Sequence, residues 1–186
     1  MRIISGSARG RTICAPQGMD TRPTQDYVRE SLFNILRARV PEARVLDLFA
    51  GSGALGLEAV SRGAQGAVFV DSGRAAVQCV KKNVAALRME TQCEVLSCDW
   101  RAAIARLSDR AFDLVFMDPP YRMENTGEMC AALLAAGALA EDGLIVVEHR
   151  RGLPPALADG LEAADTRRYG DTEVTFVRRR QEEETP

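Results

Sequence analysis

Residues 45–57 read VLDLFAGSGALGL, and this stretch decides how the chain folds. An apolar run of strand type leads directly into Gly51, Gly53 and Gly56, which have the spacing GxGxxG at the start of a helix-like segment. Glycines at such a turn allow a tight reversal and let a ligand approach the bare backbone. Asp71 lies 20 residues after Gly51, at the end of the next apolar run, where a carboxylate accepts hydrogen bonds from both ribose hydroxyls. The pattern predicts a cofactor that contains a nucleoside.

Around this stretch, short apolar runs alternate with amphipathic segments. The runs are continuous in Val, Leu and Phe, which is typical of strands that helices bury on both faces. The alternation predicts an α/β, Rossmann-like fold, in which a mostly parallel sheet carries helices on both faces. The predicted strands span residues 44–50, 67–71, 93–97, 113–118 and 143–149, and the predicted helices span residues 55–62, 74–87, 100–107 and 125–136.

The two ends of the chain differ from this middle part. Residues 2–5 and 11–15 are short β-like pieces around a turn-prone segment, which predicts a small β-hairpin. Residues 24–39 carry an apolar stripe of helical spacing and predict a helix. Residues 161–180 predict two further strands bent at residues 169–170, so we expect seven strands in the sheet, with antiparallel pairing at the C-terminal end.

Length and composition indicate one globular domain. The 186 residues fit a single domain of ordinary size, which we expect to span residues 1–180. Within it, residues 1–43 form an N-terminal extension and residues 44–180 a cofactor-binding core, followed by a flexible acidic tail at residues 181–186. The apolar content of 46% and the charged content of 27% exclude disordered, collagen-like and coiled-coil chains.

Charge and cysteine content narrow the functional classes. The formal net charge of −2 excludes a strongly basic wrapper of nucleic acid, although it leaves room for a local basic patch. The five cysteines include no CxxC pair, so we expect reduced thiols, no bound metal and a cytoplasmic protein. No apolar run approaches the ~20 residues that span a bilayer, which predicts a protein without membrane contact.

Asp47 favours one cofactor over another. A dinucleotide places its pyrophosphate at the helix N-terminus that follows the glycine loop, and a carboxylate just before this loop repels it. The same carboxylate attracts the ammonium group of a zwitterionic amino acid. S-adenosylmethionine carries such an ammonium group and a sulfonium, and it has no phosphate. The sequence therefore favours S-adenosylmethionine over NAD.

Asp99 and Trp100 follow the third predicted strand and are candidates for the adenine site. Asp99 is placed to accept a hydrogen bond from the exocyclic amine of adenine, and Trp100 to lie against the ring. Ordinary structural roles stay open for both residues, a helix N-cap for Asp99 and a core position for Trp100. The predicted cofactor contacts are Asp47, Phe49, Gly51, Gly53, Asp71, Asp99 and Trp100.

The fourth predicted strand ends in the motif Asp118, Pro119, Pro120, Tyr121. In an open α/β sheet this strand end faces the glycine loop across the switch in strand order. An aspartate carboxylate and a proline carbonyl together accept both hydrogens of an exocyclic amine, which leaves the nitrogen lone pair available for attack on a methyl group. Tyr121 offers a face on which a base turned out of its helix can stack. These four residues are the predicted catalytic residues.

The quoted motifs resemble a known family. VLDLFAGSGALGLEAVSRGA together with DPPY looks like the class I S-adenosylmethionine-dependent amino-methyltransferases. The N-terminal stretches RIISGSARGRTICAP and RPTQDYVRESLFNIL narrow the resemblance to the RsmD family of bacterial 16S rRNA (guanine-N2) methyltransferases. The resemblance covers nearly the whole chain and implies the class I methyltransferase fold. The sequence departs from the family pattern at Tyr27, where arginine is common, and at Asp71, where glutamate is common.

The resemblance also implies the roles of the site residues and the partners. Asp118 through Tyr121 would hold the target base. The substrate would be 16S rRNA, within the 30S subunit or its precursor, and the enzyme a monomer. The remaining implied contacts are Asp47, Gly51 and Gly53 to the methionine and adenosine portions, Asp71 to ribose and Asp99 to adenine.

The N-terminal extension is the candidate RNA-binding part. Residues 1–43 hold seven arginines and four acidic residues, a local positive excess in an acidic protein. Flexible Gly, Ser and Arg segments fit backbone phosphates, which dominate affinity for RNA. A solvated basic face is the alternative interpretation. The predicted RNA contacts are Arg9, Arg11, Arg22, Tyr27 and Arg29.

Three other functions compete with guanine methylation. The nearest is a DNA or RNA adenine-N6 amino-methyltransferase, since DPPY by itself does not separate the acceptors. An NAD(P)-dependent oxidoreductase would share the glycine loop. A non-catalytic RNA-binding assembly factor would not need a complete DPPY motif.

Overall fold

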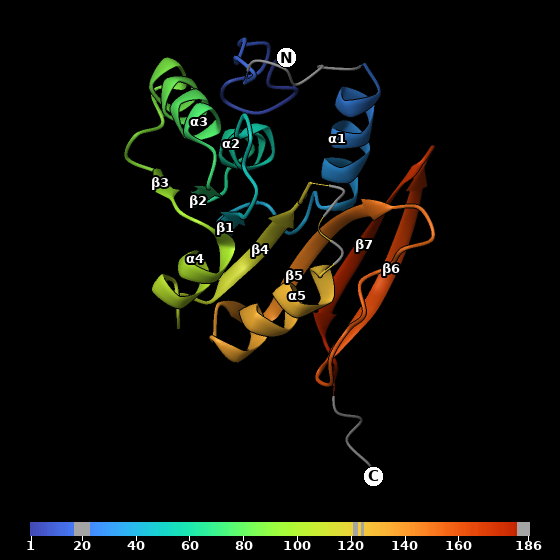
Figure 1. The fold of residues 1–186 in the computed structure, drawn as a ribbon. Coiled ribbons are helices and arrows are strands. Elements are labelled where there is room, and N and C mark those ends of the chain that lie inside the picture. Colours follow the sequence, from blue (N-terminus) through green and yellow to red (C-terminus); the bar gives the residue numbers. More distant parts are fainter. Residues whose placement is uncertain (17–22, 121–122, 124, 182–186) are drawn as a thin grey trace.

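The computed structural model describes residues 1–16, 23–120, 123 and 125–181. The described strands lie in one seven-stranded sheet in the order β3-β2-β1-β4-β5-β7-β6, and helices pack on both sides of it (Figure 1). In chain order the elements are α1 (Pro23–Ile35), β1 (Arg44–Asp47), α2 (Ala54–Ser61), β2 (Gly66–Asp71), α3 (Arg74–Leu87), β3 (Cys93–Ser97), α4 (Trp100–Arg106), β4 (Phe112–Met117), α5 (Thr126–Ala135), β5 (Leu139–Arg150), β6 (Leu161–Tyr169) and β7 (Thr172–Arg179).

The pairing of the strands confirms the predicted Rossmann-like architecture. β1 pairs in parallel with β2 and β4, β2 with β3, and β4 with β5. The C-terminal hairpin is joined by antiparallel pairing of β7 with β5 and of β6 with β7. The bend predicted at residues 169–170 is the turn of this hairpin, where Gly170 has a φ of 64°.

Each strand of the sheet centre buries side chains on both faces, as the continuous apolar runs predict. One hydrophobic cluster joins α1, α2 and α3 to one face and includes Phe33, Phe69 and Phe116. The other joins α4 and α5 to the opposite face and includes Trp100 and Met117. Because helices cover both faces of the sheet, the side chains on both faces of its parallel strands are shielded from water.

The order of the strands places β1 at the switch point of the sheet. The chain moves outward from β1 to β2 and β3 on one side, then returns to β4 on the other side. Asp47 at the end of β1 pairs with Phe116 of β4, and the Leu48 amide donates a 3.0 Å hydrogen bond to the Phe116 carbonyl. The glycine loop after β1 and the DPPY motif after β4 therefore start side by side, where ligands of open α/β sheets bind.

Several predicted boundaries differ in the structure, and β1 ends at Asp47 rather than at residue 50. The N-terminal hairpin is reduced to an isolated antiparallel bridge between Arg2 and Thr12. α1 ends at Ile35 rather than at residue 39, because the chain tightens there and the Arg39 amide bonds the carbonyl of Leu36, three residues back. β5 begins four residues early because its pairing with β4 shifts register between Phe112 and Leu114 and accommodates extra residues.

The N-terminal extension is attached to α2, the helix that follows the glycine loop. The buried carboxylate of Glu58 accepts hydrogen bonds from the Ile4 amide at 2.8 Å and the Ser5 amide at 3.0 Å. Gly6 has a φ of 84°, and a Cβ atom there would lie 1.7 Å from the carbonyl oxygen of Ser61, so only glycine fits. Within the described residues, no helix is long and apolar enough to cross a membrane.

Candidate active site

The glycine loop forms a cradle of backbone amides and two aspartate carboxylates at the carboxyl end of β1. Gly51 and Gly53 have φ values of 55° and 77°, in the left-handed region that favours glycine. Asp47 Oδ2 accepts a hydrogen bond from the Gly56 amide at 3.0 Å, and Asp71 Oδ2 accepts one from the Gly51 amide at 2.9 Å. The loop is thus held at both ends by aspartates that the sequence predicts as cofactor contacts.

The carboxyl group of Asp47 lies in an environment short of positive charge. Asp47 is only 3% exposed, and within the part of the chain that the structure describes its carboxyl group accepts one hydrogen bond, from the Gly56 amide. Burial raises the pKa of Asp47 to about 7, and the negative charges of Asp118 and Asp71 add to this while the Gly56 amide opposes it. A cationic ligand would stabilise the buried negative charge of Asp47, so the site fits an ammonium group or a sulfonium and does not fit a diphosphate.

Asp71 and Phe49 are the other predicted cofactor contacts near the loop. Asp71 Oδ1 accepts a hydrogen bond from the Gly73 amide at 2.7 Å, and each of its oxygens retains a second lone pair for a ribose hydroxyl. Phe49 is half-buried at the edge of the second hydrophobic cluster, directly after β1.

Asp99 and Trp100 take the structural roles that the sequence left open. Asp99 caps α4, because its Oδ1 accepts hydrogen bonds from the amides of Arg101 and Ala102 at 2.8 and 3.1 Å. The side chain is exposed, and among the described residues Oδ2 has no partner, so one oxygen stays available for adenine. Trp100 is buried in the second cluster, and the Arg101 guanidinium lies 4.2 Å from its ring centroid. This position does not support the predicted contact between Trp100 and the cofactor.

The DPPY motif begins at the carboxyl end of β4, beside the glycine loop. Asp118 is accessible to solvent, yet the surrounding strand ends desolvate its carboxyl group and raise the pKa of Asp118 to about 6. Pro119 is buried, and the carbonyl of Pro120 accepts a 2.7 Å hydrogen bond from the Met123 amide. The Pro119 carbonyl is therefore the better candidate for a second acceptor. Tyr121 lies outside the described residues.

The predicted RNA contacts separate into two groups. Arg29 is buried: its guanidinium donates to the Arg2 carbonyl at 2.7 Å and to Asp26 at 3.0 Å, so the predicted RNA contact is replaced by a structural role. Arg11 donates to the carbonyls of Ala86 and Leu87 at the end of α3, which favours a capping role.

Two positions of the extension remain free for RNA. Arg9 is exposed, and among the described residues its guanidinium has no hydrogen-bond or ion-pair partner, while its amide donates to the Gly6 carbonyl at 3.2 Å. Tyr27 on α1 is 66% exposed. Arg22 lies outside the described residues.

Sequence reasoning missed Glu148, which lies at the end of β5 next to β4. Glu148 lines a cavity of about 170 Å³ together with Pro119 of the DPPY motif. Burial and the nearby charge of Asp118 raise the pKa of Glu148 to about 8. A single acidic residue near the end of an apolar strand gives no local signal of this neighbourhood, because only the pairing of β5 with β4 creates it.

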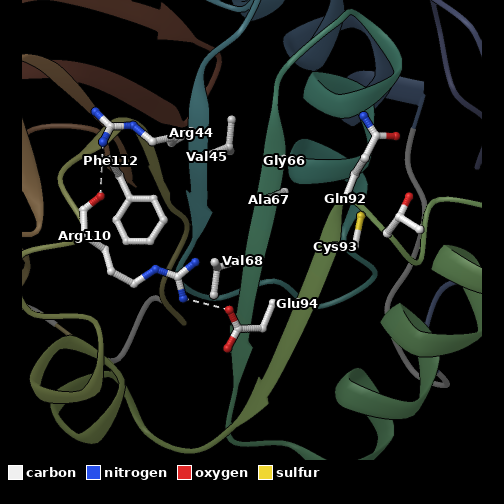
Figure 2. Close-up of a pocket in the computed structure, with 11 residues that line it drawn as sticks. Arg44, Val45, Gly66, Ala67, Val68, Gln92, Cys93, Glu94, Arg110 and Phe112 are labelled. Carbon is white, nitrogen blue, oxygen red and sulfur yellow. Dashed lines mark hydrogen bonds and ion pairs between the residues drawn. The ribbon is translucent and has the colours of Figure 1, made fainter.

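A second cavity, of about 260 Å³, lies away from this site (Figure 2). It is lined by Arg44 and Gly66, the first residues of β1 and β2, and it contains the 2.7 Å ion pair between Arg110 and Glu94. Because ligands of open α/β sheets bind at the carboxyl ends of the strands, this cavity at their amino ends is not the cofactor site.

The fold and the site define a Rossmann-like methyltransferase. The family model described as "Conserved hypothetical protein 95" matches residues 1–178. "Ribosomal RNA small subunit methyltransferase D" of Escherichia coli is 41% identical over 161 residues, which cover 86% of this chain and 80% of the relative. "Putative rRNA methyltransferase YlbH" of Bacillus subtilis is 40% identical over 184 residues, covering 97% of this chain and all of the relative.

The solved structures agree with the sequence relatives. The structure described as "Putative methyltransferase yhhF from Escherichia coli" superposes with a TM-score of 0.86 at 36% identity, over 98% of this chain and 99% of that one. The chain belongs to the family "Conserved hypothetical protein 95", the RsmD family of methyltransferases. This assignment confirms the predicted family, and with it S-adenosylmethionine as the cofactor.

Proposed function

We propose that this protein transfers a methyl group from S-adenosylmethionine to the exocyclic N2 amine of one guanine in 16S rRNA. The observation that carries the proposal is the juxtaposition of two strand ends: Asp47 and the glycine loop after β1 lie beside Asp118 and Pro119 after β4. We infer that it acts in the cytoplasm, as a monomer, on the 30S subunit or its precursor. The names of the relatives in E. coli and B. subtilis support rRNA as the substrate class.

The carboxylates of the loop would hold the cofactor. Asp47 would face its ammonium group, Asp71 its ribose hydroxyls and the free oxygen of Asp99 its adenine amine, with Phe49 beside the loop. When bound, S-adenosylmethionine supplies a methyl group on a positively charged sulfur, which is already a strong electrophile. Orientation of the acceptor is then the main task of the protein.

Asp118 and the Pro119 carbonyl would hold the acceptor amine. The lone pair of a nucleobase amine is delocalised into the ring, which makes the nitrogen a poor nucleophile. Two hydrogen-bond acceptors that bind both amine hydrogens return the lone pair to nitrogen and stabilise the positive charge that develops during attack. Asp118 then lies where it can take up the proton that the methylated amine releases.

Residues 1–43 would bind RNA, with Arg9 and Tyr27 as the accessible contacts. Since Glu58 and Ser61 attach the extension to the helix that follows the glycine loop, RNA bound there lies on the element next to the cofactor site. Residues 44–180 would then carry the catalytic core.

The test of the function is a transfer experiment with labelled S-adenosylmethionine and small subunits that lack the modification. We expect label in 16S rRNA and, after digestion, in N2-methylguanosine. Label in N6-methyladenosine would replace the proposal by its nearest alternative, the adenine methyltransferase. Transfer to free 16S rRNA and not to subunits would contradict the proposed assembly context.

Replacing Arg9 by Ala tests the role of the extension. We expect weaker RNA binding, and a slope of log affinity against log salt that is smaller by about 0.7 to 0.9, because one phosphate contact is lost. Filter binding at several salt concentrations measures the slope. Arg106→Ala, an exposed arginine on α4 at the opposite face of the sheet, is the matched control. Equal slopes for the wild type and Arg9→Ala would contradict the role.

The affinity for S-adenosylmethionine should depend on pH. In the free protein burial raises the pKa of Asp47 to about 7, so the carboxyl group is mostly protonated at pH 6 and mostly ionised at pH 8. Only the ionised form attracts an ammonium group, and we therefore expect the affinity to rise about tenfold between these values. Calorimetry in two buffers of different ionisation enthalpy would detect the proton released on binding. An affinity that is constant over this range would exclude Asp47 as the titrating partner.

A further inference from the structure

We propose that Glu148 selects the target base, by pairing with the N1–H and O6 groups of guanine while Asp118 and Pro119 hold the N2 amine. This inference rests on the proposed function and places the base at the carboxyl ends of β4 and β5, where Asp118 and Glu148 lie on neighbouring strands. It makes Glu148 a specificity-determining residue at the acceptor side of the site.

The strand register places Glu148 beside the DPPY motif. The last residue pair of β4 and β5 joins Met117 to Val147, so Asp118, directly after β4, and Glu148 of β5 are the next residues on the two neighbouring segments. Side chains alternate between the faces of a sheet. Phe116 and Val146 both belong to the first hydrophobic cluster, and therefore Asp118 and Glu148 point to that same side.

A cavity of about 170 Å³ opens beside these strand ends. Pro119, Met123, Leu153 and Pro154 give it apolar walls, and Glu148, Thr126, His149 and Arg150 give it polar ones. Among the described residues the Glu148 carboxyl group has no hydrogen-bond or ion-pair partner, so its pairing capacity is available to a ligand.

The neighbours of Glu148 favour a neutral carboxyl group. Asp118 faces it from β4, Val174 lies opposite it on β7, and Thr126 of α5 closes the cavity. On the same strand as Glu148, His149 Nε2 forms a 2.8 Å hydrogen bond with Thr175 Oγ1, and Arg150 is exposed. Burial together with the charge of Asp118 raises the pKa of Glu148 to about 8, so the group is mostly protonated at neutral pH.

A neutral carboxyl group is complementary to guanine and not to adenine. Its carbonyl oxygen accepts from the guanine N1–H while its hydroxyl donates to O6. When an adenine presents its amine to Asp118 in the same way, the next two positions are N1, which only accepts, and C2–H, which makes no conventional hydrogen bond. Adenine therefore gains one bond where guanine gains two. Thus Glu148 would separate the two acceptors that DPPY alone does not distinguish.

The experiment uses 2-aminopurine, which keeps the reacting amine of guanine and lacks N1–H and O6. Small subunits are reconstituted with 16S rRNA that carries guanine or 2-aminopurine at the methylated position. We expect the wild type to prefer guanine by about tenfold to a hundredfold in kcat/KM, since that is the usual discrimination of a bidentate contact to a base. Glu148→Leu should reduce this preference to about threefold or less. Equal preferences in the wild type and Glu148→Leu would overturn the inference and leave guanine methylation intact.

Glu148→Gln is the matched variant, because an amide also offers one acceptor and one donor in the same positions and does not titrate. It should keep the preference for guanine and lose the decline of kcat/KM above about pH 8 that we expect for the wild type. If Glu148→Leu is inactive on both substrates, Glu148→Gln decides the question. A retained guanine preference together with loss of the decline above about pH 8 supports the inference, and loss of the preference or persistence of the decline overturns it. Absence of guanine methylation by the wild type would overturn the proposed function, and the inference with it.

Discussion

We expect Asp118→Ala to lower kcat for methyl transfer by about 100- to 1,000-fold and to leave the affinity for S-adenosylmethionine nearly unchanged. The magnitude is that of removing one preorganised group that stabilises developing charge. Asp118 follows β4, on the acceptor side of the site. The cofactor side is formed by Asp47 and the glycine loop, where the Gly56 amide donates a hydrogen bond to Asp47, so the variant leaves the cofactor side in place. Single-turnover methylation of small subunits measures the first quantity, and calorimetry measures the second.

A matched control for this variant lies on the same strand. Asp113 stands at the opposite end of β4, where it forms a 2.9 Å ion pair with Arg44 at the surface. Asp113→Ala should retain kcat within about twofold, because exposed ion pairs contribute little and this one is remote from the site. A catalytic rate for Asp118→Ala close to that of Asp113→Ala would remove Asp118 from the mechanism.

We expect Asp47→Asn to weaken binding of S-adenosylmethionine by at least about 100-fold and to stabilise the free protein at pH 8. The first effect follows from the loss of the buried negative charge that faces the ammonium group, since breaking a buried pair costs about 3–5 kcal/mol. The second follows from linkage. Burial raises the pKa of Asp47 to about 7 in the folded state, so stability is lost as pH rises from about 4 towards 7.

The size of the second effect has an upper limit. A rise of the pKa of Asp47 from 3.8 to about 7 corresponds to at most about 4 kcal/mol of lost folding free energy at pH 8. Asparagine does not ionise and its side-chain oxygen can still accept from the Gly56 amide. Thermal unfolding at pH 8 and pH 5 tests this, because the gain should shrink at pH 5, where Asp47 is protonated. A variant that is less stable than the wild type at both pH values would show that the charge of Asp47 is not what costs stability.

The central part of the fold was predictable because its signals are local. The glycine loop, the apolar runs of β1 to β5 and the helices between them are all encoded within short windows, and the structure reproduces their order. Boundaries were less accurate where a tertiary contact overrides the local pattern. Leu36 keeps the helical stripe and is buried, yet α1 ends before it.

The candidate site was predictable where a motif carries its chemistry. Asp47, Gly51, Asp71 and Asp118 lie together at the switch point because the order of strand and loop along the chain determines which loop ends meet. Single polar residues were harder to assign. The sequence does not distinguish a buried arginine from an exposed one, yet Arg29 is buried and paired with Asp26 while Arg9 is exposed. Burial depends on residues that are distant along the chain, and composition does not contain this information.

The sequence by itself determined the class of fold, the glycine loop and the acceptor motif, because strand periodicity, turn-forming glycines and paired prolines act over a few residues. Only the tertiary structure decided which polar side chains are free to act. Glu58 binds amides of the N-terminal extension, Arg11 caps α3, and Glu148 meets Asp118, in each case across more than 25 residues of chain. Hydrogen bonds and charge interactions of this kind arise from packing, so they exist only once the sheet has formed.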